Sequence, residues 1–248
     1  MLLFIFCHLA TAGAALVIDA SAGQTIFEGG VHREENFAPP RLLDDLQVDI
    51  AALGEAGHFE LAGPDMRHAE YCDPVDRPPV GDWDAFFALW ERLDMVRDQL
   101  QPELGPMLPE IELHYVRYPK GGYYSRHVDD FETTEPRRSR RRVSFVAYLT
   151  PAWTDHDGGY LRVFYGDRYA DIPPLPGSLV LFDSYQIHHE VLPTNNERFC
   201  LIGWFHTPCD ALKSNCTPTR RERHEDDDFT FGARVYLNTP AAAASSDL

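Results

Sequence analysis

The stretch SLVLFDSYQIHHEVLPTNNERFCLIGWF, residues 178–205, contains three successive runs with the composition of β-strands. Aliphatic, aromatic and β-branched residues are concentrated in Ser178–Phe182, Ile187–Leu192 and Arg198–Phe205, and polar or proline-containing segments separate the three runs. Short runs bounded by turn-forming residues are typical of an all-β barrel or a double-sheet jelly roll. The stretch therefore predicts that this part of the chain is a β domain.

The same texture begins near Glu110, and four further runs precede the quoted stretch: Ile111–Tyr118, Tyr123–His127, Val143–Leu149 and Tyr160–Tyr165. Upstream of them the pattern changes. Apolar residues recur at helical spacing in residues 41–53 and again in residues 83–100, which predicts two amphipathic helices. Between them, Asp65–Asp82 is rich in Pro, Asp and Gly and is predicted to be a loop.

This order of segments predicts four regions. They are a possible signal or apolar leader (1–25), an N-terminal helical support region (26–109), the β domain (110–207) and a partly disordered C-terminal extension (208–248). Met1–Ile18 carry no charged side chain, and Ala20-Ser21-Ala22 offers the small residues of a signal-peptidase site, but no basic residue precedes them. A cleaved signal with a secretory location and a buried first segment with a cytoplasmic one stay open; a membrane anchor is less favoured.

Composition narrows the classes of partner. The formal net charge of −17 excludes nucleic acid, because a phosphate backbone requires a basic surface. Membrane contact is not expected, and the sequence does not define an oligomeric state. The five cysteines show no zinc-type spacing; Cys209 and Cys216 are candidates for a disulfide, with free thiols as the alternative.

Two histidines and one carboxylate form the ligand set of non-haem Fe(II) oxygenases, in which the opposite face of the metal stays free. Residues i and i+2 of a strand point to the same side, so His-x-Asp can direct two donors at one metal. A His-x-Asp or His-x-Glu motif occurs six times in this chain, so the motif alone decides nothing. His127 and Asp129 stand out because they end a run of the β domain and are followed by a histidine-bearing run and an arginine-headed run.

The third ligand is expected from the pair His188-His189, of which strand alternation lets only one face the metal. Arg198 lies nine positions after His189, and this spacing favours His189 over His188. A guanidinium can bind a carboxylate through two parallel hydrogen bonds, so Arg198 is a candidate carboxylate-binding residue. Three residues share its face of the strand: Cys200, Ile202 and Trp204.

Several stretches between Tyr118 and Phe205 occur in the same order in one known family. They are Tyr118-Pro119, YSRHVD (124–129), RRVSFVAYL (141–149), GGYLRVF (158–164), Ala170-Asp171-Ile172 and the run from His189 to Phe205. In them the chain resembles the prolyl hydroxylase branch of the 2-oxoglutarate oxygenases, especially the hypoxia-inducible-factor (EGL-nine-like) hydroxylases and their bacterial relatives. The resemblance implies a mainly β fold, a double-stranded β-helix (jelly-roll, cupin-like) core with supporting N-terminal helices.

The resemblance also implies roles for individual residues. It assigns His127, Asp129 and His189 as the catalytic iron ligands, and Arg198 and Tyr148 as partners of the distal carboxylate of 2-oxoglutarate. It places Tyr118 in the cosubstrate pocket and Trp204 near the active site; for Tyr148 and Trp204, barrel packing is the alternative. The implied cofactors are Fe(II), 2-oxoglutarate and O2, with ascorbate as reductant.

The implied reaction is hydroxylation of a prolyl residue in a protein or peptide, with release of succinate and CO2. The alternatives are a hydroxylase of a free amino acid or other small molecule, and a non-catalytic metal-binding β-barrel that acts as a sensing module. A zinc hydrolase is disfavoured because the chain has no HExxH motif. The basic stretch Glu132–Arg142 departs from the family; we expect a solvated loop there, with a site for an acidic substrate segment as the alternative.

Overall fold

The computed structural model describes residues 17–62, 67–131 and 137–209, and its strands form two antiparallel β-sheets. The strands of the larger sheet are β1 (Val31–Glu34), β2 (Glu60–Leu61), β4 (Glu70–Cys72), β5 (Ile111–Tyr118), β7 (Ser139–Tyr148), β10 (Leu179–Asp183) and β12 (Arg198–Pro208). Those of the smaller sheet are β3 (Arg67–His68), β6 (Tyr123–His127), β8 (Leu161–Tyr165), β9 (Arg168–Ile172) and β11 (His188–Val191). A 3-10 turn, η1 (Asp155–Asp157), precedes β8.

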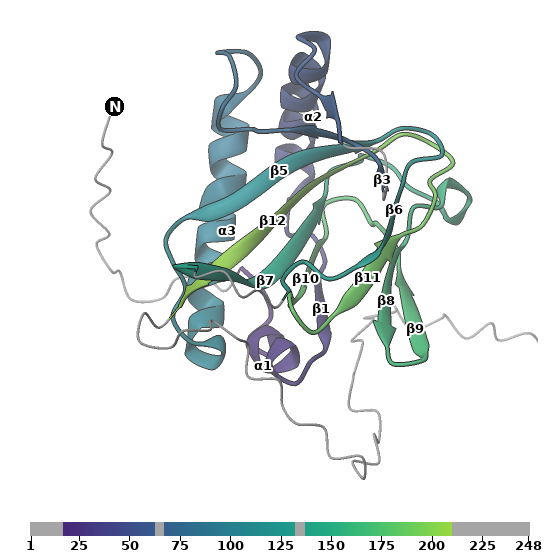
Figure 1. Cartoon of the computed structure of the whole chain (residues 1–248). Coiled ribbons are helices and arrows are strands. Elements are labelled where there is room, and N and C mark those ends of the chain that lie inside the picture. Colours follow the sequence, from purple (N-terminus) through teal and green to yellow (C-terminus); the bar gives the residue numbers. More distant parts are fainter. Residues whose placement is uncertain (1–16, 63–66, 132–136, 210–248) are drawn as a thin grey trace, which may run out of the picture.

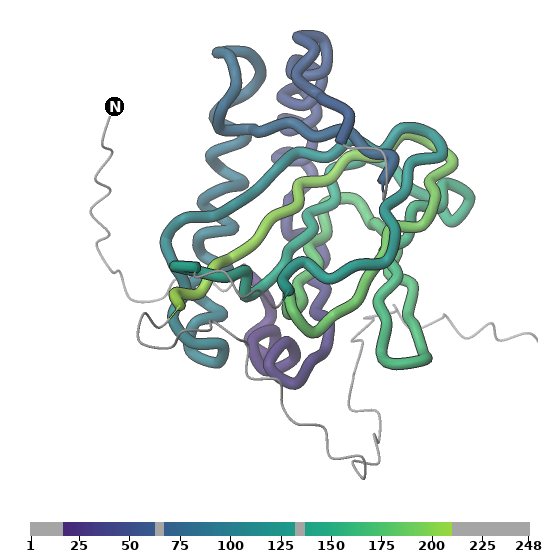
Figure 2. The backbone as a smooth tube through the Cα atoms, viewed as in Figure 1, coloured from purple at the N-terminus to yellow at the C-terminus, as the bar shows by residue number. Residues whose placement is uncertain are grey.

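The two sheets face each other as layers of a sandwich. The strand order is β1-β10-β7-β12-β5-β4-β2 in the larger sheet and β3-β6-β11-β8-β9 in the smaller one. Figure 2 shows β12 running between β5 and β7, the strands with which it pairs. Three helices lie on the outer side of the larger sheet (Figure 1). This architecture confirms the predicted fold class, a mainly β double-stranded β-helix with N-terminal helices.

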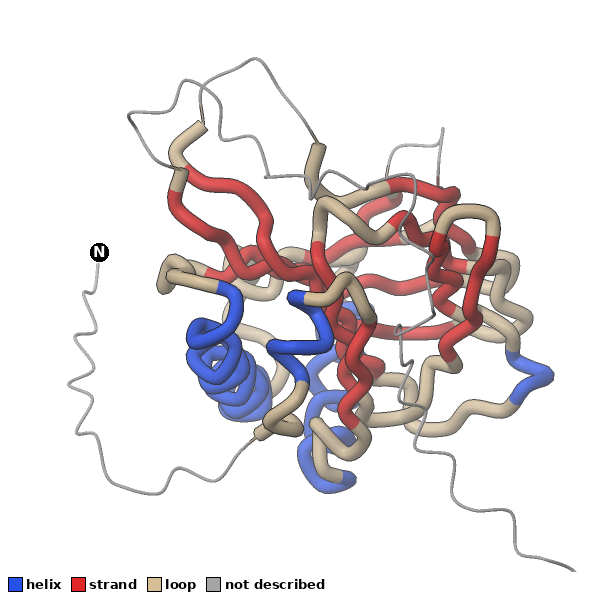
Figure 3. The backbone as a smooth tube through the Cα atoms, turned by 90° about the horizontal axis from the view of Figure 1, so that it is seen from below, coloured by secondary structure: helices blue, strands red, loops and turns tan. Residues whose placement is uncertain are grey.

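The helices form a layer of their own: α1 (Ala22–Phe27), α2 (Pro40–Glu55) and α3 (Trp83–Leu104). Pro40 stands in the first turn of α2, where a missing N–H leaves no helical hydrogen bond unmade. The Asp82 side chain caps α3 by accepting a hydrogen bond from the N–H of Ala85 at 3.0 Å. Leu46 of α2 and Leu89 of α3 are fully buried against the sheet, and Figure 3 shows helices and strands on separate sides.

The central strands of the larger sheet are buried on both faces. Along β12, Leu201 and Phe205 pack under the helices, whereas Cys200 and Trp204 face the space between the two sheets. Successive side chains of a strand point to opposite faces, so a strand that is covered on both sides needs an almost uninterrupted apolar run. This explains why the runs in residues 178–205 lack an alternation of apolar and polar residues.

Most of the predicted elements are confirmed, and the runs Ile111–Tyr118 and Tyr123–His127 agree with β5 and β6 to the residue. The prediction of a loop over Asp65–Asp82 is wrong in part, because β3 and β4 lie within it and pair with β6 and β5. Strands of two or three residues are too short to show a periodicity in the sequence. The strand β9 was also missed as a separate element.

The apolar leader lies outside the described residues as far as residue 16. The N–H of Val17 donates to Oε1 of Gln99 in α3 at 2.8 Å, and Ile18 is buried in the core. A cut at Ala20–Ala22 would therefore remove packed residues. Among the helices of the described ranges, none is long and apolar enough to cross a membrane.

The C-terminal extension lies outside the described residues from position 210 onward. Cys209, the last residue before it, is disulfide-bonded, while Cys72 and Cys200 are free and buried. Whether Cys209 pairs with Cys216, which the sequence left open beside free thiols, falls outside the described residues.

A buried ion pair joins the helical layer to the larger sheet. Asp49, on the inner face of α2, receives two hydrogen bonds from Nη1 of Arg77, at 2.7 and 2.8 Å. It also accepts hydrogen bonds from the N–H of Asp82 at 2.7 Å and from the hydroxyl of Tyr115 in β5 at 3.0 Å. The Arg77 guanidinium packs over the ring of Trp83, 4.0 Å from its centroid. One carboxylate thus connects α2, the start of α3 and β5.

We expect Asp49→Ala to destabilise the fold by about 3–5 kcal/mol, because it leaves the guanidinium of Arg77 buried without a counter-charge. The free energy of unfolding in guanidinium chloride measures this cost. Asp44→Ala, on the exposed side of the same helix, is the matched control and should change it by less than about 0.5 kcal/mol. Equal stability of the two variants would show that the pair does not hold the layers together.

Candidate active site

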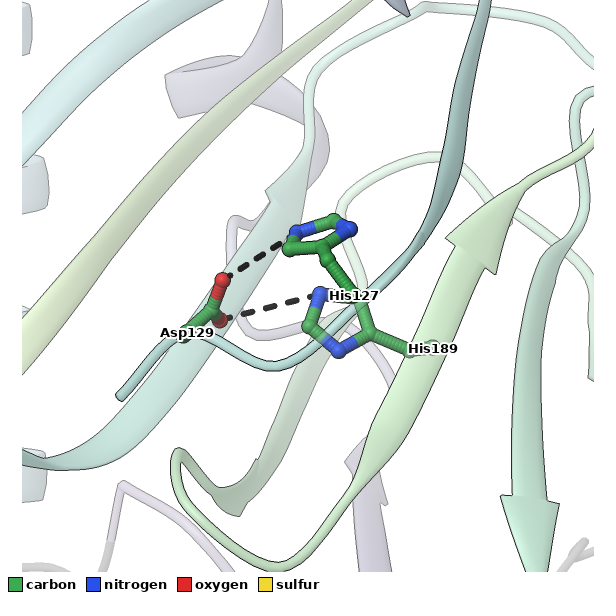
Figure 4. A group of neighbouring side chains, drawn as sticks. All are labelled: His127, Asp129 and His189. Atoms are coloured by element: carbon green, nitrogen blue, oxygen red, sulfur yellow. Dashed lines mark ion pairs between the residues drawn. The ribbon is translucent and has the colours of Figure 1, made fainter. Parts of the chain in front are cut away.

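Strand pairing brings the three candidate metal ligands together. His127, at the end of β6, lies opposite His189 of β11, and Asp129 follows two residues after the strand (Figure 4). Oδ1 of Asp129 lies 3.3 Å from Nε2 of His127, and Oδ2 lies 3.7 Å from Nε2 of His189. One donor atom of each residue lies within 4.8 Å of the other two. The three side chains are therefore close enough to bind one metal ion together.

Each histidine is oriented by its second ring nitrogen. Nδ1 of His127 lies 2.8 Å from the carbonyl oxygen of Ser125, and Nδ1 of His189 lies 3.1 Å from that of Ile187. A carbonyl oxygen can only accept, so Nδ1 carries the proton in both rings and Nε2 keeps its lone pair for a metal. Burial lowers the pKa of His189, which favours the neutral, ligating form of its ring.

The carboxylate of Asp129 is held in its ionised form. Burial by itself would raise the pKa of Asp129, but electrostatic attraction to His189 and His127 and a hydrogen bond from Ser144 outweigh it and hold the pKa below its usual range. The Ser144 hydroxyl, from β7, donates to Oδ2 at 2.6 Å. Two neutral imidazoles and an ionised carboxylate are the donors that a non-haem Fe(II) site requires.

The neighbouring histidines of β11 point to opposite sides. His189 is only 6% exposed and faces the space between the sheets, whereas His188 is exposed on the outer face. The structure therefore places His189 beside the other two candidate ligands, as strand alternation and the spacing to Arg198 predict.

The triad opens into a cavity of about 390 Å³ between the two sheets. The cavity is lined by all six residues that the sequence singled out as site residues, together with Trp204: His127, Asp129, His189, Arg198, Tyr148 and Tyr118. Residues from β5, β7 and β12 thus meet the triad of the smaller sheet in one pocket.

Arg198 gives this cavity a buried positive charge. The side chain is 3% exposed and its Nη1 donates to the carbonyl of Gly159 at 2.7 Å, but its Nε has no hydrogen-bond partner. No carboxylate of the described ranges forms an ion pair with it. Its guanidinium lies over the rings of Tyr118 and Tyr148, at 4.6 and 5.4 Å. A buried unpaired charge is costly, so this part of the cavity suits a ligand that brings its own carboxylate.

Comparison with known proteins places the chain in a family. Residues 113–206 match the family model described as the 2OG-Fe(II) oxygenase superfamily. The crystal structure of a prolyl-4-hydroxylase from Pseudomonas putida is 32% identical in sequence, with a TM-score of 0.65, over 75% of this chain and 97% of that one. The chain belongs to the 2OG-Fe(II) oxygenase superfamily. The resemblance noted in the sequence is thereby confirmed.

Other members of the superfamily are more distant. A prolyl hydroxylase from Trichoplax adhaerens, solved with a peptide fragment of the hypoxia inducible factor oxygen degradation domain, is 22% identical and has a TM-score of 0.63. The likeness covers 75% of this chain and 89% of the Trichoplax chain, and it shows that the two proteins share a fold. A PKHD-type hydroxylase from Hyphomonas neptunium is 29% identical over 86 residues, 34% of this chain and 38% of that protein. That match spans well under half of the curated relative.

The cavity also contains residues that the sequence did not single out as site residues. His114 could have been found by strand alternation, because it shares a face of β5 with Tyr118. Ser144, whose hydroxyl bonds to Asp129, shares a face of β7 with Tyr148 in the same way. Arg67 and Tyr71 carried no such signal, because they lie on β3 and β4, in the segment that was predicted to be a loop.

The basic stretch is paired rather than free. Residues 132–136 lie outside the described ranges, but Ser139–Arg142 begin β7, so the prediction of a solvated loop is wrong there. Four of its five arginines form ion pairs with carboxylates: Arg137–Asp130, Arg140–Asp130, Arg141–Glu112 and Arg142–Asp183. These ion pairs link the start of β7 to neighbouring segments. They also neutralise most of the positive charge of the stretch in the protein without substrate.

We expect Ser144→Ala to weaken Fe(II) binding by about 10- to 100-fold, because Asp129 loses the hydroxyl that orients it. Anaerobic calorimetric titration with Fe(II) measures the affinity. Ser178→Ala is the matched control, since that buried hydroxyl donates to the carbonyl of Leu175 and is not part of the triad. If both variants bind Fe(II) as the parent does, the hydroxyl has no part in orienting the carboxylate.

Proposed function

We propose that this protein is an Fe(II)- and 2-oxoglutarate-dependent dioxygenase that hydroxylates a prolyl residue in a protein or peptide, releasing succinate and CO2. The observation that carries the proposal is the shared cavity, in which a two-histidine, one-carboxylate triad faces a buried guanidinium without a carboxylate partner. A metal site alone does not require that guanidinium. A metal with an open face and a dicarboxylic cosubstrate requires both.

In this proposal Nε2 of His127, Nε2 of His189 and a carboxylate oxygen of Asp129 hold Fe(II). Bound Fe(II) and 2-oxoglutarate supply the activation of O2, coupled to decarboxylation of the cosubstrate. The protein keeps the ligands in place: the carbonyls of Ser125 and Ile187 fix the two rings. Ascorbate is the expected reductant that keeps the iron in its ferrous state.

Arg198 and Tyr148 position 2-oxoglutarate in the proposal. The guanidinium pairs with the distal carboxylate, and the Tyr148 hydroxyl beside it donates a further hydrogen bond. Burial raises the pKa of Tyr148, so that its hydroxyl keeps its proton at neutral pH. The ring of Tyr118 packs against the guanidinium and restricts its orientation. Ile202 and Trp204 add apolar walls that limit the entry of water.

The prolyl substrate is supported by the relatives. The Pseudomonas putida protein, which is named a prolyl-4-hydroxylase, is similar over 97% of its length. The Trichoplax protein was solved with a peptide fragment, so a member of this fold accommodates a peptide. A sensing module without turnover is disfavoured, because it has no use for a buried carboxylate-binding arginine beside an open metal.

We expect His189→Ala to lower succinate formation by more than about 100-fold, because two ligands cannot hold the metal in a facial arrangement. The neighbouring His188→Ala is the matched control: it removes an exposed imidazole from the same strand and should keep most of the activity. Succinate formed from 2-oxoglutarate in the presence of Fe(II) and a substrate measures both. Full activity of His189→Ala would refute the assigned ligand set.

Arg198→Met should raise the KM for 2-oxoglutarate by about 10- to 100-fold, the usual value of a hydrogen-bonded charge pair. Steady-state kinetics with varied 2-oxoglutarate measures the change. The control is Arg162→Met, which removes a surface arginine paired with Asp171 on the far side of the smaller sheet. An unchanged KM in Arg198→Met would move the cosubstrate site elsewhere.

The prolyl assignment is tested by incubating the reconstituted enzyme with proline-containing peptides, matched peptides with alanine at that position, and free L-proline. Mass spectrometry should find one added oxygen on the proline of the peptides only, matched by succinate release. Turnover with free amino acids and none with peptides would favour the small-molecule hydroxylase. Absence of succinate with every substrate tried would favour the sensing module.

A further inference from the structure

Arg67 lies next to the triad on the edge strand of the smaller sheet. It pairs with Tyr124 across β3 and β6, and its Nη1 donates to the Tyr124 hydroxyl at 3.2 Å. Its guanidinium lies 5.3 Å from the centroid of the Tyr124 ring and 5.0 Å from that of Tyr71. The Tyr124 ring in turn stacks on the ring of His127, with centroids 3.9 Å apart. Arg67 and the candidate metal ligand His127 therefore contact the same tyrosine ring.

The other charged groups that line the cavity already have partners or roles. Asp129 belongs to the triad, and Arg198 lies deep in the cavity at the proposed cosubstrate site. Arg141 is paired with Glu112 and lies over the ring of Trp204, 3.5 Å from its centroid. Arg67 also lines the cavity and is only half-buried, yet it forms no ion pair with any carboxylate of the described residues.

This lack of a carboxylate partner is notable in an acidic chain of net charge −17. The arginines around the start of β7 pair with Asp130, Asp183 and Glu112. The contacts of Arg67 are instead with two tyrosines, which orient a guanidinium through their faces without neutralising its charge. Within the described part of the chain its hydrogen bonds go only to these tyrosines, so its other N–H groups can donate to a ligand in the cavity.

We propose that Arg67 is a specificity-determining residue that binds a carboxylate of the substrate beside the reacting carbon. The proposal rests on the proposed function, since it concerns what enters the same cavity. The carboxylate is either an acidic side chain of a peptide or the α-carboxylate of a free amino acid. An extended peptide advances about 3.3–3.6 Å per residue. Because Arg67 lines the same cavity as the triad, we expect the acidic side chain one to three positions from the hydroxylated residue.

The orientation of Arg67 makes this pairing selective. A guanidinium held by two aromatic rings loses little conformational freedom when it binds, and its planar fork matches a carboxylate better than an ammonium group does. Asn or Gln at the same position of a peptide has nearly the same shape but no charge. Arg67 should therefore distinguish Asp from Asn and Glu from Gln near the reacting residue.

The test uses pairs of proline-containing peptides that differ only by Asp/Asn or Glu/Gln at one to three positions from the proline. Binding to the full chain, loaded with Mn(II) and 2-oxoglutarate without O2, is followed by fluorescence anisotropy, and turnover by succinate release in air. We expect the acidic member of at least one pair to bind about 10-fold more tightly. Arg67→Gln should remove this preference while leaving the affinity for the amide member nearly unchanged.

Two further variants separate recognition from folding. Arg41→Gln removes an exposed arginine on α2, far from the cavity, and should keep the preference for the acidic peptide. Arg67→Glu should reverse the preference, so that a peptide with Lys at the responsive position binds better than its acidic counterpart. A merely unfolded variant cannot produce such a reversal.

The outcomes distinguish this inference from the proposed function. If an acid preference in binding depends on Arg67 but no peptide is hydroxylated, the inference holds and the prolyl assignment fails. If free L-proline alone is bound or turned over and Arg67→Gln weakens this, the carboxylate is the α-carboxylate. If peptides are hydroxylated with equal preference for acid and amide, and Arg67→Gln changes neither peptide nor free amino acid binding, the inference is overturned and the proposed function stands.

Discussion

The antiparallel pairing of β6 with β11 is the constraint on which the site depends, because it sets His127 opposite His189. The register of this pair is irregular between His189 and Val191, next to the second histidine. The chain after β6 is held by backbone bonds as well, since the N–H of Asp129 donates to the carbonyl of Ser184 at 3.0 Å. The positions of the two histidines therefore follow from the backbone ladder of the smaller sheet, and the position of Asp129 follows from a backbone bond to the residue after β10 of the larger sheet.

Buried charge is treated in two ways in this molecule. Under the helices, the side chains of Asp49 and Arg77 are completely buried and neutralise each other's charge, although Nε and Nη2 of Arg77 have no hydrogen-bond partner among the described residues. In the cavity between the sheets, Arg198 is also deeply buried. Among the described residues, its guanidinium contacts only a backbone carbonyl and two aromatic rings. Pairing Arg198 internally would have been the more stable arrangement of the free protein. Without an internal partner, the guanidinium stays available for a ligand. The cost in folding free energy is offset by the core that packs on both faces of the larger sheet.

The sequence predicted the β domain well because its strands are long enough to show their composition, and because His127, His189 and Arg198 each occupy a recognisable place in successive runs. The alternation of side chains along a strand also predicted which residues of β12 line the inner face of the sheet. The same argument applied to β5 would have identified His114. Other features had no such signal. Arg67 lies on a strand of two residues inside a segment rich in turn formers, and its importance arises only from which strands are neighbours. Asp49 is a charged residue within an apolar helical stripe, and only tertiary packing reveals its partners.

The double-faced strands of the larger sheet also bear on how such a protein can diversify. Along β12 the residues that hold the helices and the residues that line the cavity alternate one by one. Substitutions at every second position can therefore reshape the cavity while the packing under the helices stays intact. An insertion of one residue has the opposite effect, because it exchanges the two faces and loses core and site together. Substitutions at alternate positions of the central strands can thus change the substrate preference and the stability of the fold independently of each other, whether in evolution or in protein engineering.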